Sequence, residues 1–125
     1  LGGGEIINAP RKQVLLHDGR KVKAHQATFH EKHNEYWYSV SPDSHQHAKD
    51  HGCEYYLFIM SNVGFVMLPF KEMEAHFQFA YTSKNMDGTT RQYQVHISPP
   101  PNVVIKEYGK AKDRDISKYF EARTD

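Results

Sequence analysis

The sequence predicts an α+β fold with a mostly antiparallel sheet and two or three short helices. Two observations carry this prediction: short segments that are apolar or alternate between apolar and polar residues, and turn residues between them. A length of 125 residues favours one domain. Hydrophobic residues make up 38% and charged residues 25%, which is typical of a globular domain and excludes a disordered chain.

The first strands are predicted from a hairpin signal. The short apolar segment 13–17 precedes Asp18-Gly19, a dipeptide typical of tight β-hairpin turns. The return arm spans residues 20–29, and its first half alternates apolar residues with Lys21, Lys23 and His25. That alternation predicts a strand with one face in solvent. The aromatic and β-branched segment 36–40 predicts the next strand.

Two helices are predicted from their start signals. Ser41-Pro42-Asp43 combines an N-cap residue, a proline for the first turn and an acidic side chain near the helix N-terminus. Gly52 ends this helix after about ten residues. Pro69 opens the second helix, whose apolar face repeats at helical spacing through Phe70, Met73, Phe77 and Ala80.

The remaining segments complete the predicted sheet. Two apolar runs, 55–60 and 64–68, predict a buried antiparallel hairpin. The polar segment 82–91, with Asp87-Gly88, predicts a loop or hairpin tip, and strands follow at 92–98 and 103–106. Between these strands, Pro99-Pro100-Pro101 predicts a stiff extended connector. Residues 115–122 predict a terminal helix with an apolar face of Ile116, Tyr119 and Phe120.

Several classes of protein are excluded by composition. The apolar runs are too short to cross a membrane, and the single cysteine, Cys53, excludes an internal disulfide and a CxxC zinc site. The start Leu1-Gly2-Gly3-Gly4 has no Met and predicts an expression scar or an interdomain linker. We therefore expect one domain over residues 5–125, cut from a longer protein. No secretory signal is visible, which predicts a cytoplasmic setting.

Charge is distributed unevenly, although the formal net charge is only +1. Residues 11–32 contain six basic and two acidic side chains, a net of +4. Residues 41–76 contain two basic and five acidic ones, a net of −3, and residues 84–112 contain five basic and two acidic ones, a net of +3. A basic face beside an acidic face is compatible with nucleic-acid binding, and equally with an ordinary mixed surface.

A histidine-rich segment is the candidate metal site. His45, His47, His51 and Cys53 lie within nine residues, and a spacing of four puts His47 and His51 on one helix face. Ala48 stands where HExxH zinc hydrolases place their glutamate, and no second ligand pair follows at a standard spacing. The sequence therefore predicts no bound metal and no cofactor. A metal-dependent hydrolase built on this cluster stays an alternative.

Aromatic and basic residues suggest a binding surface. In Tyr36-Trp37-Tyr38, strand alternation puts Trp37 on the face opposite its neighbours, so that one face is core and the other is presented. Aromatic rings beside basic side chains suit stacking on bases and contacts to phosphates, although the same rings could fill a core. The predicted nucleic-acid contacts are Arg20, Lys21, Lys23, Trp37, Lys84, Asn85 and Arg91.

Residues 54–73 combine an acidic residue, an apolar strand, a short turn, a second apolar strand ending in proline, and a helix. With segments 92–98 and 115–120, this order resembles restriction-type endonuclease and related DNA-processing domains of the PD-(D/E)XK class. Pro42-Asp43 is present, but Glu54-Tyr55-Tyr56 has tyrosine where that signature has lysine. The resemblance therefore implies a DNA-associated domain without cleavage chemistry, and no catalytic residue is carried over.

Together these observations predict a non-catalytic nucleic-acid-binding domain. It would be a DNA-recognition module of a larger restriction or defence protein, with DNA preferred to RNA as partner and other domains of the parent protein as neighbours. Two alternatives stay open. One is the metal-dependent hydrolase or nuclease built on His45, His47, His51 and Cys53, and the other is a protein-interaction module whose acidic middle segment meets a basic partner.

Overall fold

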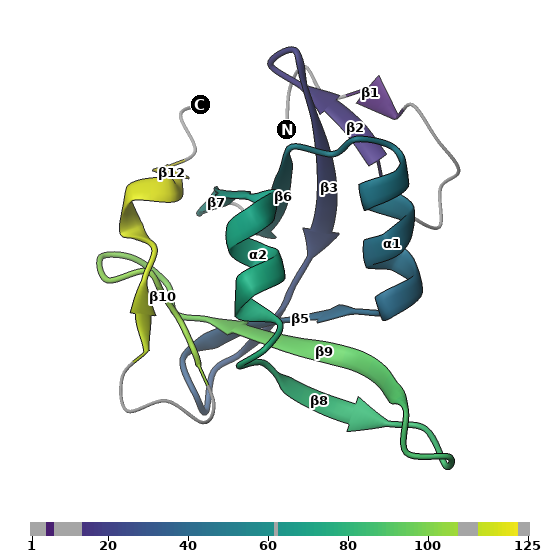
Figure 1. Cartoon of the computed structure of the whole chain (residues 1–125). Helices are drawn as coiled ribbons and strands as arrows, with labels where there is room; N and C mark the ends of the chain where they lie inside the picture. Colours follow the sequence, from purple (N-terminus) through teal and green to yellow (C-terminus); the bar gives the residue numbers. More distant parts are fainter. Residues whose placement is uncertain (1–4, 7–13, 62, 108–112, 123–125) are drawn as a thin grey trace.

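The computed structural model describes residues 5–6, 14–61, 63–107 and 113–122 (Figure 1). These residues form two sheets and two helices, so the predicted α+β class is confirmed. The predicted scar or linker at residues 1–4 lies outside the described residues.

Sheet A contains six strands in the order β1-β2-β3-β6-β7-β12. All neighbours are antiparallel except β3 and β6, which pair in parallel from Val22↔Tyr55 to Gln26↔Ile59. The predicted hairpins 13–17/20–29 and 55–60/64–68 are both found, with the first return arm ending at Gln26. The strand bounds are β1 (Glu5–Ile6), β2 (Val14–His17), β3 (Arg20–Gln26), β6 (Tyr55–Met60), β7 (Gly64–Pro69) and β12 (Phe120–Ala122).

Sheet B is antiparallel and has the order β11-β10-β9-β5-β4, and β8 pairs with β9 on the side opposite β5. The long strand β9 is central to sheet B: its residues 93–97 pair with β5, and its residues 90–94 pair with β8. The bounds are β4 (Thr28–His30), β5 (Glu35–Val40), β8 (Tyr81–Lys84), β9 (Thr90–Ile97), β10 (Val104–Ile105) and β11 (Arg114–Asp115).

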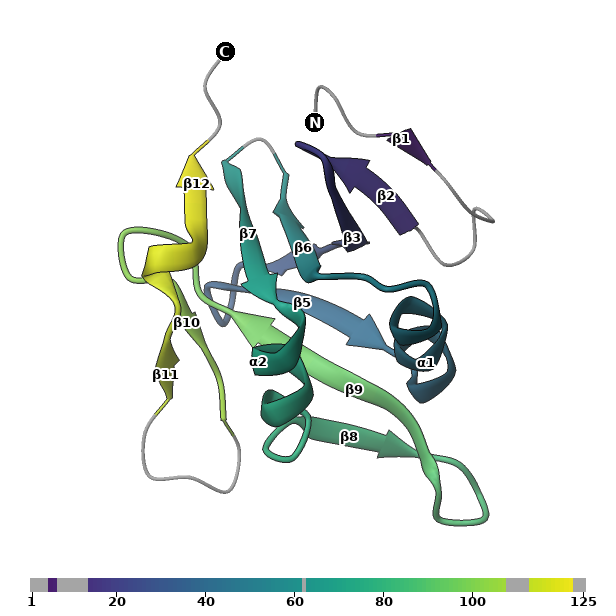
Figure 2. The ribbon, with the colours of Figure 1, turned by 45° about the horizontal axis from the view of Figure 1, so that its top comes forward.

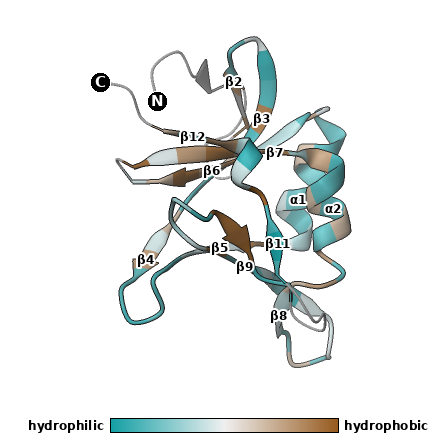
Figure 3. Cartoon of the chain, turned by 90° about the vertical axis from the view of Figure 1, so that its left-hand side faces the viewer, coloured by the Kyte–Doolittle hydropathy of each residue, from teal (hydrophilic) through white to brown (hydrophobic). Residues whose placement is uncertain are grey.

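The main core lies between the two sheets. Sheet B contributes its inward side chains Tyr36, Tyr38 and Val95, and sheet A contributes Tyr56 and Phe58. Strands β6 and β7 are apolar along most of their length, whereas the outward side of the helices is polar (Figure 3). A second, smaller cluster lies on the other face of sheet A and contains Val22, Ala24, Leu57 and Met67. Sheet A therefore buries apolar side chains on both faces.

The two helices connect strands of the two sheets. Helix α1 (Pro42–Asp50) begins as the sequence predicts, with the Ser41 hydroxyl accepting a hydrogen bond from the Ser44 amide. The helix ends at Asp50 with His51 as its C-cap residue, and Gly52 follows with a φ of +70°, a left-handed conformation that glycine adopts at little cost. Helix α2 (Phe70–His76) is shorter than its sequence face predicts, because residues 77–79 form turns. Among the described residues, no helix is both long and apolar enough to cross a bilayer.

Two predictions near the C-terminus are wrong. Instead of a terminal helix, one turn of 3₁₀ helix (Ser117–Tyr119) leads into β12, which pairs with β7. Tertiary pairing overrides the helical apolar spacing here, because Gly64 leaves room for β12: a Cβ at this position would lie 2.3 Å from the Glu121 carbonyl oxygen. The proline run is a turn with a cis Pro100–Pro101 bond rather than an extended connector.

Candidate nucleic-acid interface

The outer face of sheet B, turned away from the core, gathers polar and aromatic side chains. Strand alternation directs Trp37 and Ser39 of β5 to this face, while Tyr36 and Tyr38 are buried, so the predicted placement of Trp37 is confirmed. Register extends the outer face across three more strands: His96 lies opposite Trp37, Gln94 opposite Ser39, Tyr81 opposite Gln94 and Thr28 opposite Trp37. The exposed Tyr81, at 59%, lies at the β8 end of this surface.

Three imidazole rings surround the Trp37 indole. His96 stacks on it with ring centres 4.4 Å apart, and His30 stacks from the other neighbouring strand at 3.6 Å. His33, in the exposed turn after β4, adds a third ring at 5.2 Å. We call these four residues the histidine–tryptophan stack. Imidazoles from both neighbouring strands therefore lie against the indole of Trp37.

The Glu35 carboxylate contacts two rings of the stack. Glu35 accepts a hydrogen bond from the Trp37 indole N–H at 3.0 Å and lies 3.7 Å from His96 Nδ1. Lys106 Nζ lies 3.5 Å from Glu35 and 3.1 Å from Asp113, and the hydrogen bond that it donates to the Asp113 carboxylate raises the pKa of Lys106. Burial lowers the pKa of His96 and outweighs the opposite effect of Glu35. His96 is therefore neutral at pH 7.

The β8–β9 hairpin carries three of the predicted contacts in exposed positions. Lys84, Asn85 and Arg91 are all exposed. Lys84 Nζ donates to the Thr90 hydroxyl at 3.2 Å and the Asn85 amide donates to the Thr89 hydroxyl at 3.0 Å. Within the described part of the chain, no carboxylate forms an ion pair with Lys84 or Arg91. These two cations are therefore available to an anionic partner.

The β2–β3 hairpin commits its basic residues to contacts within the protein. The Arg20 guanidinium lies 3.6 Å from Asp18 and over the Tyr55 ring at 5.1 Å. Lys21 Nζ donates to the His51 carbonyl oxygen at 3.1 Å, at the end of α1. Lys23 is only 2% exposed, which corrects its prediction as a phosphate contact. The alternation in β3 is real, but the face predicted to be in solvent points toward the core beside Tyr56.

The two hairpins lie at opposite ends of the molecule. Figure 1 shows the β2–β3 turn at the top and the β8–β9 turn at the bottom right, and the tilted view of Figure 2 keeps them apart. The structure thus brings Trp37, Lys84, Asn85 and Arg91 to sheet B and separates them from Arg20 and Lys21. A single surface does not contain all seven predicted residues.

The histidine-rich helix turns its side chains in different directions. His45 lies between the helices, where Nδ1 is 2.7 Å from the Tyr56 hydroxyl and Nε2 is 3.1 Å from Glu74. His47 and His51 lie together, with ring centres 4.1 Å apart. In the described residues no three His, Cys, Asp or Glu side chains converge as metal ligands would. Tyr56 is fully buried, so the Tyr56–His45–Glu74 chain ties α1 and α2 to sheet A and offers no accessible nucleophile.

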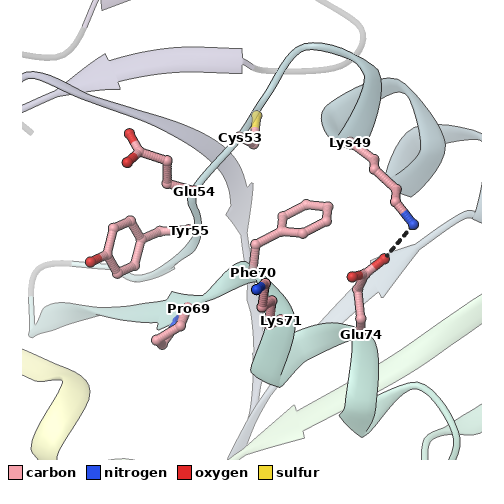
Figure 4. Close-up of a pocket in the computed structure, with 8 residues that line it drawn as sticks. All are labelled: Lys49, Cys53, Glu54, Tyr55, Pro69, Phe70, Lys71 and Glu74. Atoms are coloured by element: carbon pink, nitrogen blue, oxygen red, sulfur yellow. Dashed lines mark ion pairs between the residues drawn. The ribbon is translucent and has the colours of Figure 1, made fainter.

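A pocket of about 470 Å³ lies between α1, the start of β6 and α2 (Figure 4). Its lining charges balance, with Lys49 and Lys71 against Glu54 and Glu74 around Phe70, and Lys49 pairs with Glu74 at 3.2 Å. Burial raises the pKa of the Cys53 thiol, although Lys23 and Lys21 oppose this shift. Cys53 is therefore a protonated, inert thiol at neutral pH.

Comparisons with family models, curated proteins and solved structures gave no match for this chain. The resemblance to restriction-type endonucleases stays a prediction. Asp43 lies in the first turn of α1 and Glu54 precedes β6, while Tyr56 is bound to His45 in the core.

Sequence reasoning missed four residues of the outer face: His30, His33, Tyr81 and His96. A signal for His96 was present, because it alternates with Val95 and Ile97 in a strand whose apolar side is evident. No sequence signal places His30 and Tyr81 on the same surface, because their strands meet only through β5 and β9.

Proposed function

We propose that this domain binds nucleic acid, without cleaving it, through the outer face of sheet B and the adjoining β8–β9 hairpin. The observation that supports this most directly is that exposed rings lie near two cations that form no ion pair among the residues the structure describes. Tyr81 and the histidine–tryptophan stack lie on one face of sheet B, and strands β8 and β9 lead from there into the hairpin that carries Lys84 and Arg91. Rings for base stacking beside cations for phosphates are the two components that such binding requires.

The positions of two carboxylates support the proposal of binding without cleavage. Asp43 belongs to a helix start rather than to a metal-binding strand, and Glu54 lines the pocket near α1. Neither residue lies on sheet B. We therefore propose a recognition module of a larger restriction or defence protein in the cytoplasm, with DNA preferred to RNA.

The two hairpins allow a matched test, because each offers two exposed basic residues. The double variant Lys84→Ala/Arg91→Ala should weaken nucleic-acid binding and lower the slope of log K against log salt by about 1–2 units, since two phosphate contacts are lost. Binding is measured by fluorescence anisotropy at several salt concentrations.

The control is Arg20→Ala/Lys21→Ala, which removes the same charge from the opposite end of the molecule. It should leave both the affinity and the salt slope close to those of the unchanged protein. An equal loss in both double variants would mean that net charge alone drives binding, and a loss only in the control would move the interface to the β2–β3 hairpin. Either outcome contradicts the proposed interface.

A further inference from the structure

We propose that the nucleic acid bound by this domain is single-stranded, with its bases stacked on the outer face of sheet B and its phosphates along the β8–β9 hairpin. This inference rests on the proposed function and names its substrate class. It follows from the placement of the rings, from the chemistry of the hairpin tip and from the route between them.

The rings on the outer face need bases whose flat faces are open. In a duplex each base is stacked on its neighbours about 3.4 Å away, so a protein ring lying on the duplex surface meets only base edges or the backbone. Bases of a single strand can splay apart and stack on aromatic or imidazole rings. Tyr81 is 59% exposed and His33 is also exposed, so both rings are accessible to a base from solvent.

The two ring positions are too far apart for adjacent stacked bases. Tyr81 lies opposite Gln94, Gln94 lies opposite Ser39, and Trp37 precedes Ser39 by two residues. Two strand spacings across the sheet and two residues along it separate Tyr81 from Trp37 by roughly 12 Å. A single-stranded nucleic acid whose bases have come apart can reach both rings, whereas the stacked bases of a duplex cannot.

Polar side chains line the route between the two ring positions. The Ser39 hydroxyl lies 3.0 Å from Gln94 Oε1, and this pair occupies the surface between Tyr81 and the histidine–tryptophan stack. A serine hydroxyl and a glutamine amide can both donate to and accept from the edges of unpaired bases. This route suits any base sequence and provides no fixed pattern of base readout.

The hairpin itself does not fit the alternative in which a two-stranded ribbon enters the major groove of a duplex. The leading turn contains Asp87, whose pKa is lowered by hydrogen bonds from Thr89, so its carboxylate is ionised at neutral pH. A ribbon in the groove places its tip between two phosphate backbones, where this carboxylate would be repelled, whereas a single strand that contacts Lys84 and Arg91 need not cross the tip. Asn85, the side chain suited to reading adenine, already donates to Thr89 within the turn.

The test compares one labelled oligonucleotide of about 15 nucleotides, a length covering the usual site size, as a single strand and as a duplex with its complement. Both are titrated by fluorescence anisotropy against the whole chain at two salt concentrations. We expect the single strand to bind at least about tenfold more tightly, the effect of one or more stacked bases. Equal affinity, or tighter duplex binding, would overturn this inference and leave the proposed function standing, whereas no binding to either would overturn both.

A variant pair tests the stacking itself. Tyr81→Ala should weaken single-strand binding about tenfold with an unchanged salt slope, while Tyr81→Phe, which keeps the ring, should stay within about twofold of the unchanged protein. Thermal melting of both variants verifies that each is folded, which is expected because Tyr81 is exposed. If both variants bind like the unchanged protein, or both lose binding equally, stacking on Tyr81 is wrong.

Discussion

The β2–β3 and β8–β9 hairpins are similar in sequence character but differ in what covers them. Both have a turn with Asp followed by Gly, and both carry basic residues next to that turn. Strand β3 lies in the middle of sheet A, paired with β2 and β6, so its side chains face packed groups on both sides. Strand β8 pairs only with β9 in the described structure, and its two end residues, Tyr81 and Lys84, are exposed.

The comparison shows that the packing around a strand determines whether its basic residues are buried or exposed. Lys23 is buried and Lys21 donates to the end of α1, whereas Lys84 and Arg91 project from a two-stranded arm. The β2–β3 hairpin therefore contributes to stability, and the β8–β9 hairpin is the one left for a partner. Three measurements test this difference between the two hairpins.

The largest expected effect is on stability, at Lys23. Lys23→Ala should lower the free energy of unfolding by about 2–4 kcal/mol, because it removes a long side chain from a packed site. Lys23→Met keeps the volume without the charge and should cost much less. Urea unfolding of the two variants measures both values, and Lys84→Ala, within about 0.5 kcal/mol of the unchanged protein, is the exposed counterpart. If Lys23→Ala left the free energy of unfolding unchanged, the structural role of β3 would be contradicted.

The second effect is a dependence of stability on pH that arises from His25, also on β3. Burial, followed by the nearby charge of Lys23, lowers the pKa of His25 to about 3, and among the described residues its buried Nε2 has no hydrogen-bond partner. Between about pH 3 and 6.5 the unfolded chain binds a proton that the folded chain does not. His25 therefore makes stability fall with acidity, by about 2–3 kcal/mol from pH 6.5 to 4.5.

Unfolding at several pH values tests this effect. His25→Leu should remove about one proton from the slope of unfolding free energy against pH, while the shift from the buried His76 remains. Parallel curves for the variant and the unchanged protein would show that His25 does not titrate between the two states.

The smallest effect concerns binding at the outer face. His30 and His33 supply two of the three imidazole rings that stack on Trp37, so replacing both reduces the ring surface on which a base can stack. The double variant His30→Gln/His33→Gln should weaken single-strand binding by about fivefold, or ~1 kcal/mol, with an unchanged salt slope. Fluorescence anisotropy at two salt concentrations measures this loss.

A histidine on sheet A provides the control for this measurement. His17 lies on β2 against Phe65, away from sheet B, so His17→Gln should leave single-strand affinity unchanged. An equal loss in this control, or unchanged binding by the sheet B variant, would contradict a role of the stack in binding.

Local chemistry in the sequence determined much of the fold. The Ser41 cap, Pro69 and the Asp18-Gly19 turn act through bonds and dihedral angles within a few residues, so their helices and hairpin follow directly. The alternation around Trp37 was equally local, because strand geometry fixes which side chains share a face.

Tertiary structure alone decided which of those faces became a surface. The same alternation left Trp37 outside and buried Lys23, because β3 gained a parallel neighbour, β6, that no local pattern encodes. At the C-terminus, pairing with β7 outweighed helical spacing and produced β12. His30, Tyr81 and His96 meet Trp37 on one face through contacts between residues distant in sequence, and such contacts depend on the packing of the whole chain rather than on the propensity of any segment.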